Sequence, residues 1–165
     1  MFQRLSPKTK SLGWLIFLGL LVAPASAHTV KVSGDVAALF HINPNHNPRA
    51  GQQSLAWFEL TRRGGQQIPF TQCNCQLAVY PESHNEGSKP LMQPALKAVS
   101  AEQHQGVLGA YITFPQPGIY ELELNGTPKA GASFKPFSLS YEVTVQPGGS
   151  SPSNSSGTEG MDMKH

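Results

Sequence analysis

Apolar and polar residues alternate along several short runs of this chain, and this alternation restricts the fold more than any other feature. In residues 119–124 (IYELEL), Tyr120, Leu122 and Leu124 have one parity, and the two glutamates have the other. Residues 137–145 alternate in the same way. Side chains of a strand point alternately to two faces, so these runs predict strands with one buried face. Roughly six or seven such runs, separated by turn residues, predict an all-β antiparallel sandwich.

Residues 1–27 have the three parts of an export signal. A basic start (Arg4, Lys8, Lys10) precedes an apolar run over 12–22, and Ala25-Ser26-Ala27 gives a small-residue cleavage site. The apolar run is shorter than the roughly 20 residues that a membrane-spanning helix needs. We therefore expect a periplasmic or secreted protein with no stable membrane span after cleavage; an uncleaved signal anchor is the alternative.

The remaining chain divides into a domain and a tail. Residues 28–146 are close to the usual length of an immunoglobulin-like domain. In 114–120 (FPQPGIY), Tyr120 follows a Pro-Gly turn, which resembles the corner between strands E and F of such domains. That resemblance implies an immunoglobulin-like β-sandwich in which the Tyr120 hydroxyl hydrogen-bonds back across the turn. From residue 147 the composition shifts to Gly and Ser, which predicts a disordered tail over 147–165.

The stretch 54–80 is expected to form a central hairpin. Two apolar runs, 55–60 and 77–80, flank Arg63-Gly64-Gly65-Gln66, a sequence typical of a turn between antiparallel strands. Trp57 interrupts the alternation of the first run, so we expect that strand to be covered on both faces.

Three weaker signals complete the outline of the domain. Residues 28–42 look like one opening strand bent at a bulge around Gly34. Residues 125–128 (NGTP) read as a turn. Residues 95–104 fit either a short helical turn or an edge strand.

Charge and motif content exclude some functions. The chain has 12 Lys and Arg against 10 Asp and Glu. Three of the basic residues precede residue 28, which leaves 9 against 10 and a formal charge of −1. Nucleic-acid binding needs a clustered basic excess, so we expect no nucleic-acid partner. Hydrolase, metalloprotease and phosphate-loop motifs are absent, and Asp35, Glu59 and Glu82 have no acid–base partner at a suitable spacing. The sequence therefore predicts a protein that is not an enzyme.

Cys73 and Cys75 are the only cysteines. In an oxidising compartment two cysteines usually pair, although positions i and i+2 of a straight strand lie about 6.5 Å apart, so pairing needs a bend. A structural disulfide or two buried thiols is the simpler interpretation. The functional alternative is a redox couple or a thiolate pair for a soft metal.

Histidines give the candidate metal site. Cleavage after Ala27 would make His28 the first residue, with a free amine and an imidazole, and His41 or His46 would add another nitrogen. Such nitrogen sets suit Cu(II). Here the chain resembles secreted copper-binding sandwiches of the CopC and YtkA-like kind, and the resemblance implies copper ligation by His28. The simpler alternative is that these histidines are polar loop residues without a metal.

Two further hypotheses follow from the sequence. Met161, Met163 and His165 provide two thioethers and an imidazole on the tail, which is a donor set for Cu(I). The alternative to a copper-binding role is an accessory domain that docks on a larger envelope protein through a sheet edge or the 41–52 loop.

Overall fold

The structure is a computed structural model that describes residues 29–82, 84–85 and 87–149. Several expectations lie outside these residues: the export signal over 1–27, His28, and the Met161, Met163 and His165 donor set. Within the described ranges, no helix has the length and apolar character needed to cross a membrane.

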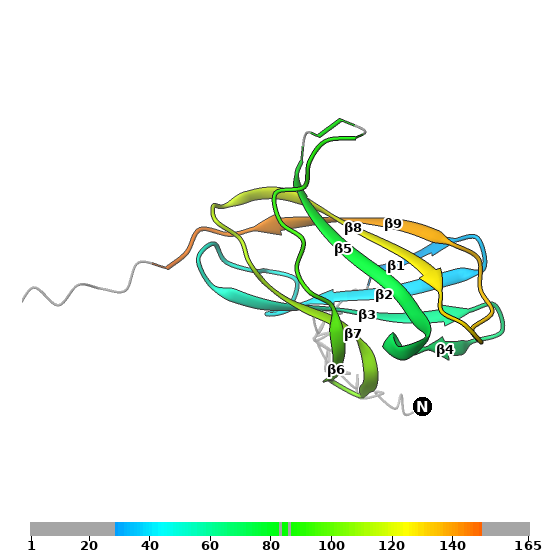
Figure 1. The fold of residues 1–165 in the computed structure, drawn as a ribbon. Helices are drawn as coiled ribbons and strands as arrows, with labels where there is room; N and C mark the ends of the chain where they lie inside the picture. Colours follow the sequence, from blue (N-terminus) through cyan, green and yellow to red (C-terminus); the bar gives the residue numbers. More distant parts are fainter. Residues whose placement is uncertain (1–28, 83, 86, 150–165) are drawn as a thin grey trace, which may run out of the picture.

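Two antiparallel sheets pack face to face (Figure 1). The larger sheet has the order β1-β2-β3-β7-β6, with β4 paired to β3. Its strands are β1 (Thr29–Ser33), β2 (Val36–Ile42), β3 (Gln53–Arg62), β4 (Gln66–Ile68), β6 (Lys97–Ala101) and β7 (His104–Thr113). The smaller sheet has the order β5-β8-β9, with β5 (Cys73–Pro81), β8 (Gly118–Pro128) and β9 (Phe137–Val145). The predicted all-β sandwich is confirmed.

The core lies between the sheets and follows the alternation of the sequence. In β8, Tyr120, Leu122 and Leu124 are buried, as their shared parity predicts. A hydrogen bond crosses the core, because the Tyr141 hydroxyl of β9 donates to the carbonyl oxygen of Ala38 in β2 at 3.1 Å. Burial raises the pKa of Tyr141 well above its ordinary value. Tyr141 therefore ties the two sheets together.

The corner between β7 and β8 has the geometry that the immunoglobulin-like resemblance implied. The Tyr120 hydroxyl donates to the carbonyl oxygen of Gln116 at 2.9 Å. This tyrosine corner is the one found in immunoglobulin-like sandwiches, in which two antiparallel sheets pack face to face. Here the larger sheet has six strands and the smaller one has three.

The expected central hairpin is wrong. The turn over residues 63–65 exists, but it joins β3 to the short β4, and β5 pairs with β8 in the other sheet. Pro69 ends β4, because proline has no N–H to donate to a ladder, and the 3-10 turn η1 (Phe70–Gln72) then carries the chain across to the smaller sheet. The expectation that the first strand is covered on both faces is correct, since Ala56, Trp57 and Phe58 are all buried.

Both smaller turn assignments also change. Gly34 is in a turn between two separate strands, with Ser33 paired to Val36 and φ of +63° at the glycine, rather than in a bulge of one strand. Residues 125–128 continue β8. Gly126 pairs with Cys75 on one side and Phe137 on the other. A glycine is needed there because a Cβ would collide with the Phe137 ring and the Cys73 sulfur. The undecided stretch 95–104 contains an edge strand, β6.

Candidate functional site

His41 and Trp57 lie side by side on the outer face of the larger sheet. They are cross-strand partners in the β2–β3 ladder, and their neighbours Phe40 and Phe58 point into the core. The two rings are stacked, with centroids 5.4 Å apart. Although both side chains point away from the core, His41 is only 4% exposed and Trp57 is 0% exposed. This part of the outer face is therefore buried under a second layer.

His46 belongs to that second layer. It lies in the loop after β2, where its backbone N–H donates to the carbonyl oxygen of Ile42 at 2.8 Å. Its imidazole is edge-on to His41, with ring centroids 4.4 Å apart, and it also contacts Phe40. The structure thus brings together His41 and His46, two of the three predicted ligands. The third, His28, lies outside the described residues.

A second histidine approaches Trp57 from the neighbouring strand on its other side. His104, the first residue of β7, lies with its ring centroid 5.0 Å from that of Trp57. Its Nδ1 is 3.0 Å from Oε2 of Glu59, the residue two positions beyond Trp57 on the same face of β3. A carboxylate on Nδ1 fixes the orientation of an imidazole and leaves Nε2 to face outward.

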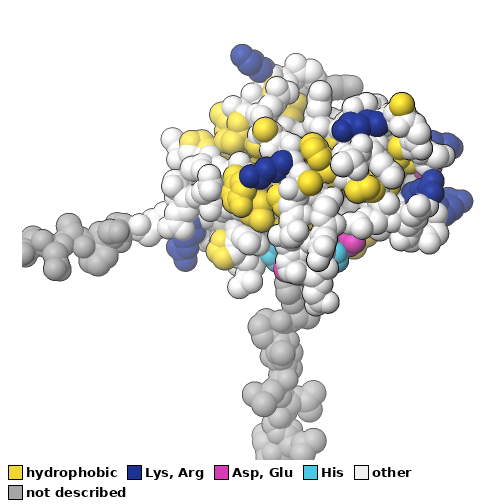
Figure 2. Space-filling model, turned by 60° about the horizontal axis from the view of Figure 1, so that its bottom comes forward, with side chains coloured by type: hydrophobic (Ala, Val, Ile, Leu, Met, Phe, Trp, Pro, Cys, Tyr) yellow, Lys and Arg dark blue, Asp and Glu magenta, His cyan; other side chains and the backbone are white. Residues whose placement is uncertain are grey.

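Glu102 adds a carboxylate beside His41. It lies in the turn between β6 and β7, and its Oε1 is 3.7 Å from Nε2 of His41. Imidazole and carboxylate side chains are visible beside one another at the lower edge of the face in Figure 2. His46 and Glu102 both have positive φ, at 59° and 53°. Left-handed backbone is uncommon for non-glycine residues and is concentrated at functional sites.

Four residues of the site were not predicted from the sequence: Trp57, Glu59, Glu102 and His104. Glu59 was predicted to have no acid–base partner, because its partner His104 comes from another strand. The residues with positive φ, His46 and Glu102, are not glycines. The sequence therefore gives no sign that these turns have left-handed backbone. An available signal was Trp57 itself, because a large aromatic residue at an outward position needs a cover.

The site has donors but not a closed metal-binding cage in the described ranges. Within them, no group of three or more His, Cys, Asp or Glu side chains is arranged to hold a metal ion. The close pairs are His41 with His46 and His41 with Glu102. Two imidazoles and a carboxylate are donors that suit Cu(II) when a further nitrogen is supplied.

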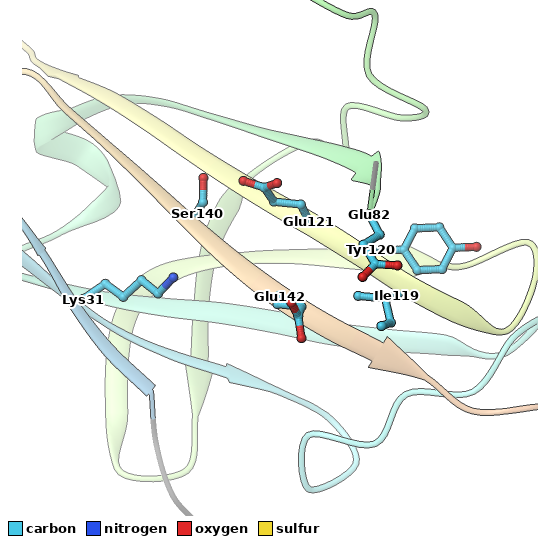
Figure 3. Close-up of a pocket in the computed structure, with 7 residues that line it drawn as sticks. All are labelled: Lys31, Glu82, Ile119, Tyr120, Glu121, Ser140 and Glu142. Atoms are coloured by element: carbon cyan, nitrogen blue, oxygen red, sulfur yellow. The ribbon is translucent and has the colours of Figure 1, made fainter. Parts of the chain in front are cut away.

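The smaller sheet has its own histidine–glutamate pair. His84 Nδ1 is 3.6 Å from Oε2 of Glu121, and the His84 ring stacks on Tyr80 with centroids 4.1 Å apart. A shallow pocket of about 220 Å³ lies nearby (Figure 3). It is lined by Lys31, Glu82, Ile119, Tyr120, Glu121, Ser140 and Glu142. This face is acidic and has no imidazole among its lining residues.

Cys73 and Cys75 are joined by a disulfide. Their Cα atoms are 5.2 Å apart, closer than in a straight strand and within the usual range for a disulfide. The pair lies at the start of β5 in the smaller sheet, so it is not part of the group around Trp57.

Fold and site together define a class: an immunoglobulin-like β-sandwich with an imidazole-rich, buried outer face on its larger sheet. No protein-family model matches the chain, and no curated protein matches it. Among solved structures, a DUF4426 family protein from Pseudomonas aeruginosa is similar, with a TM-score of 0.51 at 13% identity over 73% of this chain and 99% of that one.

FetP of uropathogenic Escherichia coli is similar to the same degree. Its structure, from protein expressed in the periplasm, has a TM-score of 0.51 at 15% identity over 73% of this chain and 94% of FetP. A copper-bound FetP variant gives 0.51 at 14% identity over 72% of this chain and 95% of that one. At these identities the likeness concerns the fold.

Proposed function

We propose that this protein is an exported, non-enzymatic copper-binding domain that holds Cu(II) through the amine and imidazole of His28 together with His41 and His46. The observation that carries the proposal is the contact between His41 and His46, whose ring centroids are 4.4 Å apart on a buried outer face. Imidazole nitrogens are favourable ligands for Cu(II), which prefers tetragonal N and O surroundings.

The register of the first ladder supports a contribution from His28. Thr29, the first described residue, pairs with Phe40, which directly precedes His41. The described part of β1 therefore starts beside the end of β2 that carries His41. We propose that signal cleavage after Ala27 supplies the amine and imidazole of His28 as further ligands at this end of the ladder.

Glu102 is a candidate oxygen ligand of the copper ion. Alternatively, it could hydrogen-bond to His41 and orient that ligand without binding the ion. Its 3.7 Å separation from Nε2 of His41 is longer than a charge-assisted hydrogen bond. Two atoms bound to one ion at about 2 Å each would lie roughly 3–4 Å apart, which fits this spacing. The Glu102 side chain is 44% exposed, so it is free to adjust to an ion.

Two further facts favour copper over other ligands of the same face. A fold neighbour, a FetP variant, is described as copper-bound, and another FetP structure came from protein expressed in the periplasm, the compartment predicted here. In addition, the donor set has imidazoles and a carboxylate but no thiolate, because both cysteines are bonded to each other.

The test uses Trp57, the only tryptophan after residue 27. Cu(II) bound at His41 should quench its fluorescence, because the indole stacks on the His41 ring. We expect a chain that begins at His28 to bind Cu(II) well over tenfold more tightly than a chain with one glycine added before His28. His46→Asn, which keeps a residue tolerant of positive φ, should also lose at least tenfold.

His84→Ala serves as the matched control, since His84 contacts a glutamate on the other sheet. Its copper affinity, measured by fluorescence and by calorimetry, should stay within about twofold of the parent chain, a difference below 0.5 kcal/mol. Equal binding at micromolar or weaker affinity by all four proteins would overturn the copper proposal.

A docking role is the second candidate, and one observation favours it. β1 is an edge strand of the larger sheet, and its Val30 and Val32 are 58% and 68% exposed. The 41–52 loop is the weaker docking element, because Ala50 and Gly51 are hydrogen-bonded to Gln146 and Phe114. The partner would be an envelope protein that adds an apolar strand to this edge.

A further inference from the structure

We propose that the Cys73–Cys75 disulfide is a site of thiol–disulfide exchange, at which a protein dithiol of the cell envelope attacks the sulfur of Cys75. This function is independent of copper binding and is located on the smaller sheet. Four features of the structure carry it: the span of the bond, the unequal exposure of its two cysteines, the uncharged pocket beside it and the free edge of β5.

The bond does not connect separate parts of the fold. It encloses only Asn74, and both cysteines already belong to one ladder, with Cys73 opposite Pro128 and Cys75 opposite Gly126. The stabilisation that a disulfide gives by restricting the unfolded chain grows with the length of the loop that it closes. A one-residue span is therefore expected to contribute little to the stability of the domain.

The two cysteines differ in their exposure to solvent. Cys73 is 1% exposed and packs in the core, whereas Cys75 is only half-buried and faces a surface pocket. Reactive cysteines are characteristically those that are partly exposed, and exposed disulfides are the ones that exchange. We therefore infer that an incoming thiolate attacks Cys75, the more exposed cysteine, and that Cys73 is the leaving group.

The pocket beside Cys75 suits an approaching peptide. It has a volume of about 250 Å³ and is lined, besides Cys75, by Gln76, Leu77, Gln93, Pro94, Ala95 and Leu96. No lining residue is charged, so a negatively charged thiolate meets no carboxylate in the pocket. Amide and apolar side chains of this kind accommodate an uncharged extended segment of a partner.

The strand that carries the bond is an edge strand. β5 pairs with β8 on one side, and on its other side the described chain makes an isolated bridge, between Val79 and Met92. Cys75 lies four residues before Val79 along β5, away from this bridge. A partner segment can add to a free strand edge by main-chain hydrogen bonds, which would hold its cysteines next to Cys75.

The reaction balances as a two-electron exchange with a dithiol. The first partner thiolate bonds to the Cys75 sulfur, and the Cys73 sulfur leaves with the electron pair and takes up a proton. The second partner thiol, as its thiolate, then attacks the partner's own sulfur in the mixed disulfide, and Cys75 leaves and is protonated. The partner ends as a disulfide, and this protein ends with two thiols.

Reduction should leave the fold in place. Gly126 leaves the space in which the Cys73 sulfur sits against Phe137, because a Cβ at that position would collide with both. This space is set by β8 and β9 rather than by the disulfide, so the Cys73 thiol can remain in it. The reduced protein is therefore a folded dithiol, as an exchange partner must be.

The test compares two single-cysteine variants in an otherwise native mature chain. Cys73→Ser leaves the Cys75 thiol, and Cys75→Ser leaves the Cys73 thiol; the double serine variant gives the background. With millimolar oxidised glutathione, followed by mass spectrometry, Cys75 should form the mixed disulfide at least tenfold faster than Cys73. Comparable rates, or faster reaction of Cys73, would overturn the proposed attack at Cys75.

A second measurement separates exchange from a structural role. Dithiothreitol should reduce the native protein while its far-UV spectrum and Trp57 fluorescence stay constant, and the reduced form should melt within a few degrees of the oxidised form. If reduction instead proceeds only as fast as global unfolding, or lowers the melting temperature by tens of degrees, the bond is a structural crosslink and the proposal is wrong.

Discussion

Two histidine–glutamate pairs of almost equal spacing lie on opposite sheets, and their surroundings differ. His41 and Glu102 are 3.7 Å apart on the larger sheet, and His84 and Glu121 are 3.6 Å apart on the smaller one. The His41 side chain is 5% exposed and contacts a second imidazole, whereas the His84 side chain is 18% exposed and stacks on the half-buried Tyr80. The spacing of a pair is thus a poor guide to a site.

The larger sheet differs from the smaller one because a second layer of side chains covers Trp57 on its outer face. Residues from two loops and a neighbouring strand meet there, and two of them, His46 and Glu102, have left-handed backbone. On the smaller sheet, the glutamate of the pair lies directly opposite another glutamate, Glu142, which is typical of a solvated face. The difference indicates that, of these two pairs, the first has the more enclosed histidine, while its glutamate Glu102 stays exposed.

The largest expected effect tests this layer through its central residue. Trp57→Ala should lower the free energy of unfolding by about 3–5 kcal/mol, because it empties a fully buried position. Tyr80→Ala removes the corresponding ring under His84 and should cost only about 1 kcal/mol, the size of an aromatic pair contact. Urea denaturation measures both. Similar losses for the two variants would remove the distinction between the faces.

The sequence predicted the strands better than their connections. Alternation in β8 and β9 is a local property, so both strands and their buried faces were predicted correctly. The hairpin over 54–80 was wrong because the Gly64-Gly65 turn is real but leads into a strand of three residues. Gly126 was misread as a turn residue, since the Phe137 ring that requires a glycine there comes from the next strand.

The candidate site was predicted only in part, and for a physical reason. The proximity of His41 and His46 follows from their separation along the chain. Glu102 and His104 arrive from a distant hairpin, and their positions depend on the pairing of β3 with β7. Such contacts carry no local signal. Trp57 marks where they meet, but a single sequence does not say which residues cover it.

The next prediction tests whether a change in the core between the sheets affects copper binding on the outer face of the larger sheet. Tyr141→Phe removes the hydrogen bond to the Ala38 carbonyl and should lower the free energy of unfolding by about 1–2 kcal/mol. Copper affinity should stay the same, since the change lies inside the sandwich. Denaturation and Trp57 quenching on the same protein check both statements; a loss of affinity would show that the faces are coupled through the core.

The same variant should also alter the alkaline limit of stability. Burial raises the pKa of Tyr141 in the folded protein, so the folded state retains a proton that the unfolded state loses near pH 10. Stability that is fully present below that pH therefore declines as pH rises further. Tyr141→Phe should make this decline less steep in melting curves recorded between pH 9 and 11. An unchanged slope would mean that other groups control the alkaline transition.

The smallest effect concerns the acidic pocket of the smaller sheet. Glu121 and Glu142 are directly opposite in the β8–β9 ladder, and both line the pocket with Glu82 (Figure 3). Like charges at opposing positions are destabilising, so Glu142→Gln should raise the free energy of unfolding by about 0.5 kcal/mol, and more at low salt than at high salt.

Glu123→Gln is the control for this prediction, because Glu123 lies opposite Ser140 and accepts a hydrogen bond from the Asn125 side chain at 2.8 Å. It relieves no repulsion between opposing residues and should give no gain. If Glu142→Gln instead destabilised the protein, the two carboxylates would be stabilised by a further interaction, such as a bound cation. The acidic face would then be a site in its own right, and the contrast between the two sheets would have to be abandoned.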